Sequence, residues 1–520
     1  MKNALGIEIP EYVEGYGKTE PFQGAWAKLK GDRLDEHVAP SAAKARIPHT
    51  SKIKENIKEA IIASNPKDGM TVSFHHHLRG GDDIVCKALD ILAELGIKDI
   101  TLASSSLTNI HDPLVKYLED GTITTIWSSG IRGKLGEAVT EGKLKNPAII
   151  HSHGGRVRAI KTGRVKIDLT IIAAAAADEE GNATGCHGPS AFGSIGYAII
   201  DAKYARKVIV VTDNIVNYPC VPISIRQTLV DHVVKVDAIG DPKKIASGTT
   251  RITKSPLDLR IANLAAKVIE HSGLFQNGFS FQVGAGGASL AVAKFVREKM
   301  KNTGVRGSFV LGGVTSYVVD MLNEGLFRSI FDVQSFDAAV SSSLLNNKHH
   351  IEIPASLYAN PFNCGSMTNK LDIVVLGALE VDTNFNINVI TGSDGNIRGA
   401  SGGHSDTASG AKLTIVVCPS FRGRIPIVKD KVHNVITPGE TVHCIVTERG
   451  ICVNPQFPNL KAKLIKAGLE IKDIIELKEE VEQITGKPKE IKTEDKIVGL
   501  IEYRDGTIID VIKQIQQTVE

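Results

Sequence analysis

The sequence predicts an α/β protein with two similar, open α/β domains in tandem, each a mostly parallel sheet covered by helices. Three polar residues recur 204 positions later: Asp168 as Asp372, Asp178 as Asp382 and Asn182 as Asn386. Solenoid repeats have periods of about 20–50 residues, so this longer period indicates a duplicated domain. Short apolar, strand-like segments also alternate with helix-like segments across glycine turns, which favours parallel sheets. A length of 520 residues is too great for one core.

The chain opens with a polar, proline-containing segment that lacks apolar periodicity, and we expect it to form an extended arm. The elements expected next are a helix marked by Ile53, Ile57 and Ile61, a strand at 70–74, a helix at 82–95 and a strand at 100–103. The predicted boundaries are an N-terminal arm at 1–50, a first domain at 51–245, a second domain at 246–455 and a C-terminal helical and hairpin extension at 456–520.

The second domain repeats the order of the first. Its expected elements are a strand at 279–283, a glycine loop at 284–287, a helix at 289–301 and a strand at 308–311. The segment 240–256 is rich in Asp, Pro, Lys, Ser and Thr, which predicts a linker. In the extension, residues 460–481 are amphipathic and predict a helix. Asp505-Gly506 between two apolar runs predicts a hairpin.

The composition argues against several classes of function. A net charge of +3 and an aromatic content of 5% offer no basis for nucleic-acid binding. The first 21 residues lack an apolar signal segment, and the apolar stretches are shorter than the roughly 20 residues of a membrane span. The seven cysteines are dispersed and form no CxxC pair, which predicts reduced thiols in the cytoplasm.

A glycine-rich loop follows the first strand of the second domain. It contains Gly284, Gly286 and Gly287 and leads into a helix. Ser289 stands where a dinucleotide fingerprint needs Gly or Ala, which argues against nicotinamide binding. We expect a loop that presents backbone N–H groups to a phosphate, an anion or an oxyanion, although a simple tight turn would have the same pattern.

A second glycine pair, Gly402-Gly403, is followed by His404 and by an apolar strand. Two glycines beside a titratable side chain predict a pocket lined by backbone. A polar hairpin loop is the competing interpretation. Gly130 to Gly136 is a third glycine-rich turn, and it contains Arg132 but lacks the ending of a phosphate-binding P-loop.

Histidines and an arginine cluster at the end of the first domain's first strand. His75, His76 and His77 precede Arg79, and adjacent histidines on a strand point to opposite faces, so no complete metal set is expected. We predict instead that His75, His76 and Arg79 bind a carboxylate, because the guanidinium fork matches its geometry. A structural role is the alternative. Ser104 and Ser105 end the next strand and should face the same ligand or cap a helix.

These motifs together resemble the coenzyme A transferase superfamily. Within it, residues 52–515 are similar to the citrate lyase alpha chain family. The motifs that carry the resemblance are Arg79-Gly80-Gly81-Asp82, Arg132-Gly133-Lys134-Leu135-Gly136-Glu137, Gly286 to Val292, Ser335-Phe336-Asp337 and Arg398 to Thr407. The resemblance implies two tandem α/β domains of the coenzyme A transferase type.

The resemblance also implies an activity and a set of partners. The activity is citrate coenzyme A transferase, in which citrate displaces acetate from an acetyl thioester on an acyl carrier protein. A lyase (beta) subunit would then cleave the citryl thioester to oxaloacetate within an oligomeric complex that also contains the acyl carrier (gamma) subunit. The chain itself would bind no cofactor or metal. The carrier's prosthetic group, or acetyl-CoA, would be its thioester substrate.

One position departs from the superfamily. Most coenzyme A transferases form a covalent glutamyl thioester, and in our alignment that glutamate is replaced by Ser308. A serine side chain cannot form the acyl anhydride of the glutamate route. We therefore expect direct transfer in a ternary complex.

The resemblance suggests roles for the candidate residues. The expected citrate ligands are His75, His76, Arg79, Ser104, Ser105, Arg132, Arg156 and Arg398. The expected thioester cradles are Gly284, Gly286, Gly287, Gly402 and Gly403, with His404 and Ser308 as further catalytic candidates. The alternatives are a transferase or hydrolase for another carboxylate such as citramalate, and a non-catalytic sugar-phosphate sensor.

Overall fold

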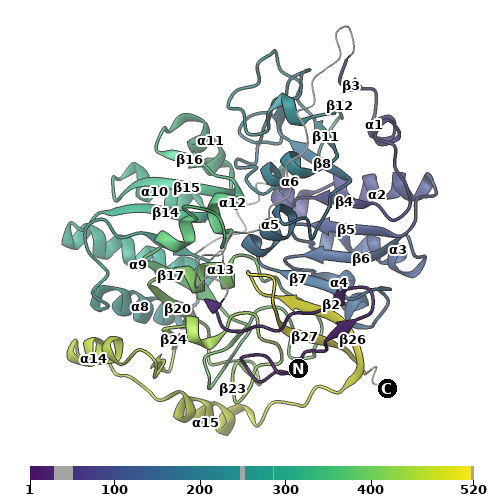
Figure 1. Ribbon diagram of the computed structural model, residues 1–520. Helices are drawn as coiled ribbons and strands as arrows, with labels where there is room; N and C mark the ends of the chain where they lie inside the picture. The colour runs from purple at the N-terminus through teal and green to yellow at the C-terminus, as the bar shows by residue number, and fades with distance from the viewer. Residues whose placement is uncertain (28–50, 246–251, 285, 517–520) are drawn as a thin grey trace.

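A computed structural model of the chain describes residues 1–27, 51–245, 252–284 and 286–516. Two large sheets lie side by side and form the framework (Figure 1). The first sheet has the order β27-β26-β7-β6-β5-β4-β8-β11-β12-β3. Its strands are β3 (Ile53–Lys54), β4 (Thr71–Phe74), β5 (Ile100–Ser104), β6 (Ile123–Ser128), β7 (Ala148–His151), β8 (Leu169–Ala174), β11 (Lys207–Thr212), β12 (His232–Lys235), β26 (Thr493–Glu502) and β27 (Ile508–Ile515).

The second sheet has the order β16-β15-β14-β13-β17-β20-β24-β25. Its strands are β13 (Phe281–Val283), β14 (Gly307–Val314), β15 (Phe327–Ser335), β16 (His350–Glu352), β17 (Ile373–Gly377), β20 (Leu413–Val417), β24 (Cys444–Thr447) and β25 (Gly450–Val453). Only β27 and β25 run antiparallel to their neighbours within these two sheets as described. The predicted fold class, with mostly parallel sheets, is confirmed.

The two sheets share one topology. The order β7-β6-β5-β4-β8-β11-β12 matches β16-β15-β14-β13-β17-β20-β24 strand for strand, as a duplication requires. The repeated polar residues have equivalent structural roles. Asp168 Oδ2 accepts from Thr71 N at 3.0 Å and Asp372 Oδ2 accepts from Ser280 N at 2.8 Å, so each carboxylate fixes the start of a central strand.

The other repeated pair closes a turn after β8 and β17. Asp178 Oδ1 accepts from the backbone N of Asn182 at 3.0 Å, and Asp382 Oδ1 accepts from that of Asn386 at 2.9 Å. The repeated residues therefore belong to the framework of the fold, because their carboxylates accept hydrogen bonds from backbone N–H groups.

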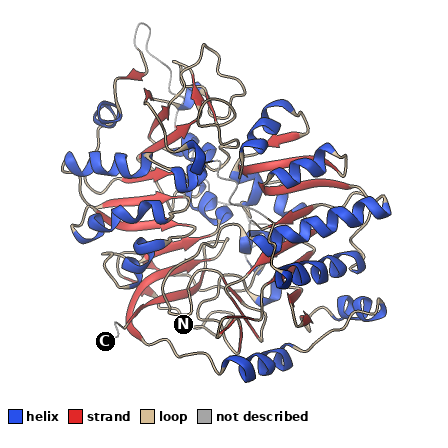
Figure 2. Cartoon of the chain, turned by 180° about the vertical axis from the view of Figure 1, so that it is seen from behind, coloured by secondary structure: helices blue, strands red, loops and turns tan. Residues whose placement is uncertain are grey.

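Helices cover both sheets, as Figure 2 shows from behind. Those of the first half are α1 (Ile57–Ala63), α2 (Ile84–Glu94), α3 (Val115–Glu119), α4 (Gly133–Thr140), α5 (His153–Lys161) and α6 (Ala198–Tyr204). Those of the second half are α8 (Pro256–His271), α9 (Gly287–Thr303), α10 (Ser316–Asn323), α11 (Ala338–Asn346), α12 (Ala355–Ala359) and α13 (His404–Gly410). Helices α5, α6, α12 and α13 lie between the two sheets (Figure 1).

Most predicted elements are confirmed within a few residues, and two differ. The first helix begins at Ile57 because the Asn56 side chain caps it, while Ile53 lies in β3. The amphipathic stretch 460–481 forms two helices, α14 (Pro458–Lys466) and α15 (Ile474–Thr485), separated at Gly468, which has a φ of +77°.

The central strands of the second sheet are buried on both faces. Val374 of β17 and Val416 of β20 belong to a hydrophobic cluster that includes the first sheet. Their neighbours Val375 and Val417 belong to a second cluster on the outer face. Alternation along these strands therefore packs the second sheet against the first half as well as against its own helices.

The C-terminal hairpin belongs to the first sheet, because β26 pairs in parallel with β7. Residues 1–27 of the predicted arm lie along this hairpin, where Phe22 N donates to Ile508 O at 2.9 Å. Residues 28–50 of the arm and 246–251 of the linker lie outside the described residues, so the predicted domain boundaries stay predictions. No helix among the described residues is long and apolar enough to cross a membrane.

Candidate functional site

A cleft of about 480 Å³ lies between the two halves, at the carboxyl ends of strands from both sheets. Parallel sheets place their ligands at this edge. The first half supplies His76, Arg79, Ser106, Thr108, Ser129, Arg132, His153 and Tyr197. The second half supplies Gln282, Val283, Gly284, Gly286, Ser289, Gly313, Gln334, Phe336, Tyr358, Leu376, Gly377 and Ala400 to His404.

Two arginines give the cleft its positive charge. Arg132 is the N-cap residue of α4, and no ion pair or side-chain hydrogen bond joins its guanidinium to any described residue. Arg79 donates from Nη1 to Phe336 O at 2.7 Å and stacks over the Phe336 ring at 4.4 Å. Burial lowers the pKa of Arg79 to about 10, so it stays protonated at neutral pH. The cleft can therefore hold an anion.

No described residue that lines the cleft is Asp, Glu, Cys or Lys. A carboxylate on these walls would neutralise an arginine, and a carboxylate or thiolate could act as a covalent nucleophile. The described walls offer neither. They suit an anionic ligand and a reaction between two bound substrates.

The cleft histidines are held neutral. His404 Nε2 lies 2.9 Å from Gly377 O, so it carries the proton, and Nδ1 accepts from the Thr437 hydroxyl at 2.7 Å. Burial lowers the pKa of His404 to about 4 and that of His153 to about 3. The pKa of His76 is also well below its usual value, first because it is buried and then because of His153. None of the three acts as a cation near pH 7.

Two glycine loops face the arginines across the cleft. Gly286 is the N-cap of α9, a helix of 17 residues, so the helix presents its free N–H groups and positive dipole end to the cleft. Gly402 has a φ of +53°, and a Cβ on Gly403 would lie 2.4 Å from Tyr358 Oη. These glycines let the backbone approach a ligand closely. Gly287 follows in α9, and Ala285 lies outside the described residues.

Several predicted ligands do not line the cleft. His75 is fully buried, with Nε2 3.0 Å from Asp201 Oδ2. Arg156 is also buried, and it donates to both oxygens of Asp201 at 2.7 and 2.6 Å. Arg398 is exposed and pairs with Asp394 and with Glu137. These side chains pair with carboxylates of the protein itself and do not line the cleft.

The predicted serines also lie away from the cleft wall. Ser105 Oγ lies 2.6 Å from His76 Nδ1, so Ser105 orients a cleft histidine, and Ser104 donates to Ser106 O at 3.1 Å. Ser308 lies at the amino end of β14 and donates to Phe279 O at 3.2 Å. The cleft is at the other end of this strand, where Gly313 lines it. Ser308 therefore lies at the end of β14 that is away from the cleft.

Sequence reasoning missed several polar residues of the wall. Gln282 is a polar residue between two apolar residues of β13, and Gln334 is the next-to-last residue of β15. Gln334 Oε1 lies 2.9 Å from His76 Nε2, and Gln282 Nε2 donates to Tyr358 Oη at 3.0 Å. Tyr197 and Tyr358 gave no signal, because a lone tyrosine in a helical segment is usually a core residue.

Comparison with known proteins places the chain in a family. Residues 50–515 match the family model described as "Citrate lyase, alpha subunit (CitF)". The citrate lyase alpha chain of Klebsiella pneumoniae is 46% identical over 518 residues and is covered in full, as is this chain. The Escherichia coli citrate lyase alpha chain is 48% identical over 466 residues, which cover 90% of this chain and 91% of that protein.

Comparison with solved structures supports the same family assignment. A citrate lyase alpha subunit structure from Streptococcus mutans, in complex with citrate, has a TM-score of 0.95 at 50% identity and covers 99% of this chain and 100% of its own. The malonate decarboxylase alpha subunit of Acinetobacter baumannii has a TM-score of 0.62 at 14% identity, with coverage of 83% of this chain and 92% of that one. The second likeness concerns the fold alone.

Proposed function

The chain belongs to the family of citrate lyase alpha subunits, and from this premise we propose that its cleft transfers an acyl-carrier thioester from acetate to citrate. Acetyl thioester and citrate give citryl thioester and acetate. A lyase subunit of the complex then cleaves the citryl thioester to oxaloacetate and restores the acetyl thioester. All seven cysteines are free thiols, which supports a cytoplasmic location.

The observation that carries the proposal is the make-up of the cleft wall, with two arginines and no acidic or thiol residue among those described. A citrate carboxylate oxygen attacks the acetyl carbonyl, the C–S bond breaks and the thiolate leaves. The thiolate then attacks the citryl carbonyl of the mixed anhydride, and acetate departs. The enzyme forms no covalent bond in either step, so it acts by alignment, which lowers the barrier by roughly 7–11 kcal/mol at best.

The geometry supports a division of roles. Arg132 and Arg79 bind carboxylates of citrate, since their guanidinium forks match carboxylate geometry. The N-terminal N–H groups of α9 and the loop at Gly402-Gly403 bind the thioester carbonyl, whose oxygen becomes negative during attack. One such donor typically contributes about 2.7–4 kcal/mol. The Streptococcus mutans relative carries citrate, which supports the choice of acid.

The test compares Arg132→Gln with Arg398→Gln in an assay of acetyl-CoA, citrate, citryl-CoA and acetate. Loss of Arg132 should lower kcat/KM for citrate about 30-fold, as expected for about 2 kcal/mol from a charge-assisted contact. KM for acetyl-CoA should change little. Arg398 pairs only at the surface, so its variant should stay within about twofold of the wild type.

Two further measurements separate the alternatives. A wild-type preference for citramalate over citrate would reassign the acid. A glutamate modified after incubation with acetyl-CoA and borohydride, seen by mass spectrometry, would refute direct transfer.

A further inference from the structure

We propose that Arg504, in the turn of the C-terminal hairpin, is a positioning residue that sets the geometry of the cleft without contacting it. The proposal rests on the transferase function proposed above. Arg504 follows β26 in the chain, roughly a hundred residues beyond the last segment that lines the cleft, and its side chain is 1% exposed.

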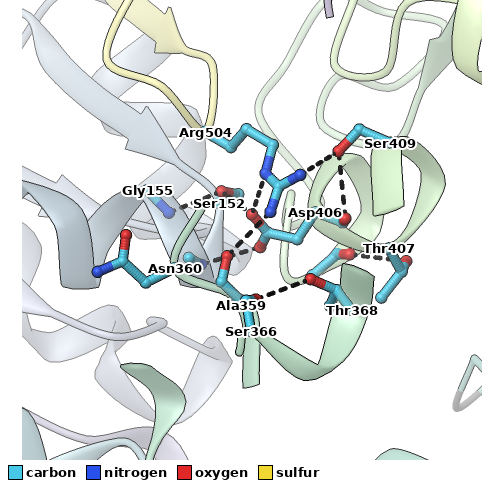
Figure 3. Close-up of polar contacts among 12 residues, drawn as sticks. Ser152, Gly155, Ala359, Asn360, Ser366, Thr368, Asp406, Thr407, Ser409 and Arg504 are labelled. Atoms are coloured by element: carbon cyan, nitrogen blue, oxygen red, sulfur yellow. Dashed lines mark hydrogen bonds and ion pairs between the residues drawn. The ribbon is translucent and has the colours of Figure 1, made fainter. Parts of the chain in front are cut away.

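Arg504 lies at the centre of a buried polar cluster formed by three distant parts of the chain (Figure 3). Its Nη1 donates to Ser409 Oγ at 2.5 Å, its Nη2 donates to Ala359 O at 3.2 Å, and its Nε lies 3.5 Å from Asp406 Oδ1. Asp406 accepts from Ser152 Oγ at 2.8 Å. Asp406 Oδ1 thus lies between the hairpin and the N-cap residue of α5.

Apart from Ser409, the residues of the cluster that contact Arg504 or Asp406 lie one or two positions from a residue of the cleft wall. The first branch reaches His153. Ser152 is the N-cap of α5, and Asp406 Oδ2 accepts from Gly154 N at 2.9 Å, so both neighbours of His153 are held. His153 N in turn donates to Gly402 O at 2.8 Å. This branch therefore fixes the distance between His153 and the loop at Gly402-Gly403.

The second branch reaches the opposite wall. Ala359, the acceptor of Arg504, directly follows Tyr358, which lines the cleft and accepts from Gln282. The third branch is α13 itself, since Asp406 lies two residues after His404. One guanidinium, acting directly and through Asp406, therefore sets the relative positions of α5, α12 and α13, three of the four helices between the sheets.

The hairpin does not need Arg504 to stay in place. Four residue pairs join β26 to β7, from Gly499↔Ala148 to Glu502↔His151. A second buried ion pair, Arg158 Nη2 to Glu502 Oε1 at 2.6 Å, also ties α5 to the hairpin, and neither partner lines the cleft. Loss of Arg504 should therefore displace the cleft walls rather than release the hairpin.

Burial makes this cluster sensitive to small changes. Desolvation raises the pKa of Asp406 to about 6, and the Arg504 charge opposes that rise. A lysine at 504 keeps the charge, but its three N–H groups sit on a single nitrogen, so they do not reproduce the spacing of the three guanidinium nitrogens that contact Ser409, Ala359 and Asp406. A misplacement of about 1 Å in a reacting geometry can cost about 100-fold in rate.

The experiment measures kcat, KM for citrate and acetyl-CoA, and the thermal midpoint for Arg504→Lys, with Arg158→Lys as the matched control. Arg504→Lys should lower kcat about 100-fold and leave both KM values within about threefold, because the walls still bind but are misaligned. Arg158→Lys loses a comparable buried contact of the same hairpin and should keep kcat within about threefold.

The proposal would be overturned if both variants lost kcat equally and also lost the same amount of thermal stability. An Arg504→Lys enzyme with wild-type kcat would overturn it as well.

If Arg504→Lys does not fold, the comparison moves to two helix caps. Ser152→Ala, which removes the contact with Asp406, should lower kcat at least tenfold more than Ser255→Ala at the start of α8. Equal kcat in these two variants would also overturn it. A wild-type enzyme without transferase activity would instead refute the proposed function.

Discussion

Arg156 offers a test of whether a buried arginine serves the framework or the substrate. It binds Asp201 through two hydrogen bonds of 2.7 and 2.6 Å, and Nη2 also donates to Ala103 O at 2.9 Å. Asp201 is fully buried, and Arg156 is the main group that keeps the pKa of its carboxyl low against the effect of burial. Removing Arg156 leaves a buried carboxylate without its strongest partner.

We expect Arg156→Met to destabilise the protein by about 3–5 kcal/mol, the usual cost of breaking a buried ion pair. The double variant Arg156→Met/Asp201→Leu removes both charges and should recover at least half of that loss. Urea unfolding followed by circular dichroism measures both, alongside the Kd for citrate by calorimetry. In the folded double variant, citrate should bind within about threefold of the wild type, because Arg156 does not line the cleft.

The outcome that would refute this reasoning is an Arg156→Met protein of wild-type stability with weak citrate binding. It would mean that the guanidinium leaves Asp201 and reaches the substrate. Destabilisation that the second substitution fails to relieve would instead contradict the ion-pair explanation.

Two further predictions concern Ser308 and His404. Ser308→Ala should leave kcat within about twofold of the wild type and cost about 1 kcal/mol of stability at most. The reason is that the Ser308 hydroxyl donates only to Phe279 O, at the end of β14 that is away from the cleft. A tenfold loss of transfer rate would contradict this prediction. The pKa of His404 is lowered to about 4, so the unfolded chain binds a proton between about pH 6.5 and 4 that the folded protein does not. His404 should therefore contribute about 2 kcal/mol to the loss of unfolding free energy between pH 7 and pH 5. His404→Gln should reduce that loss by the same amount in urea titrations at both pH values, and an unchanged loss would show that His404 titrates normally.

The sequence alone determined the fold class and the family. The repeat at 204 positions survives because Asp168 and Asp372 each fix the start of a central strand, a requirement that both copies of the sheet retain. Glycine loops after strands also predicted where the cleft backbone lies, since close approach to a ligand needs residues without side chains. Gly286, Gly402 and Gly403 all line the cleft.

Only the tertiary structure decided which charged residues are free to bind. Arg132 and Arg156 look alike in sequence, since each is next to a glycine in a glycine-rich segment. The packing nevertheless gives Arg156 a buried carboxylate partner and leaves Arg132 facing the cleft. A pairing between residues far apart in the chain has no local pattern. The same reason hid Arg504, whose partners Ala359, Asp406 and Ser409 meet it only when the C-terminal hairpin joins the first sheet.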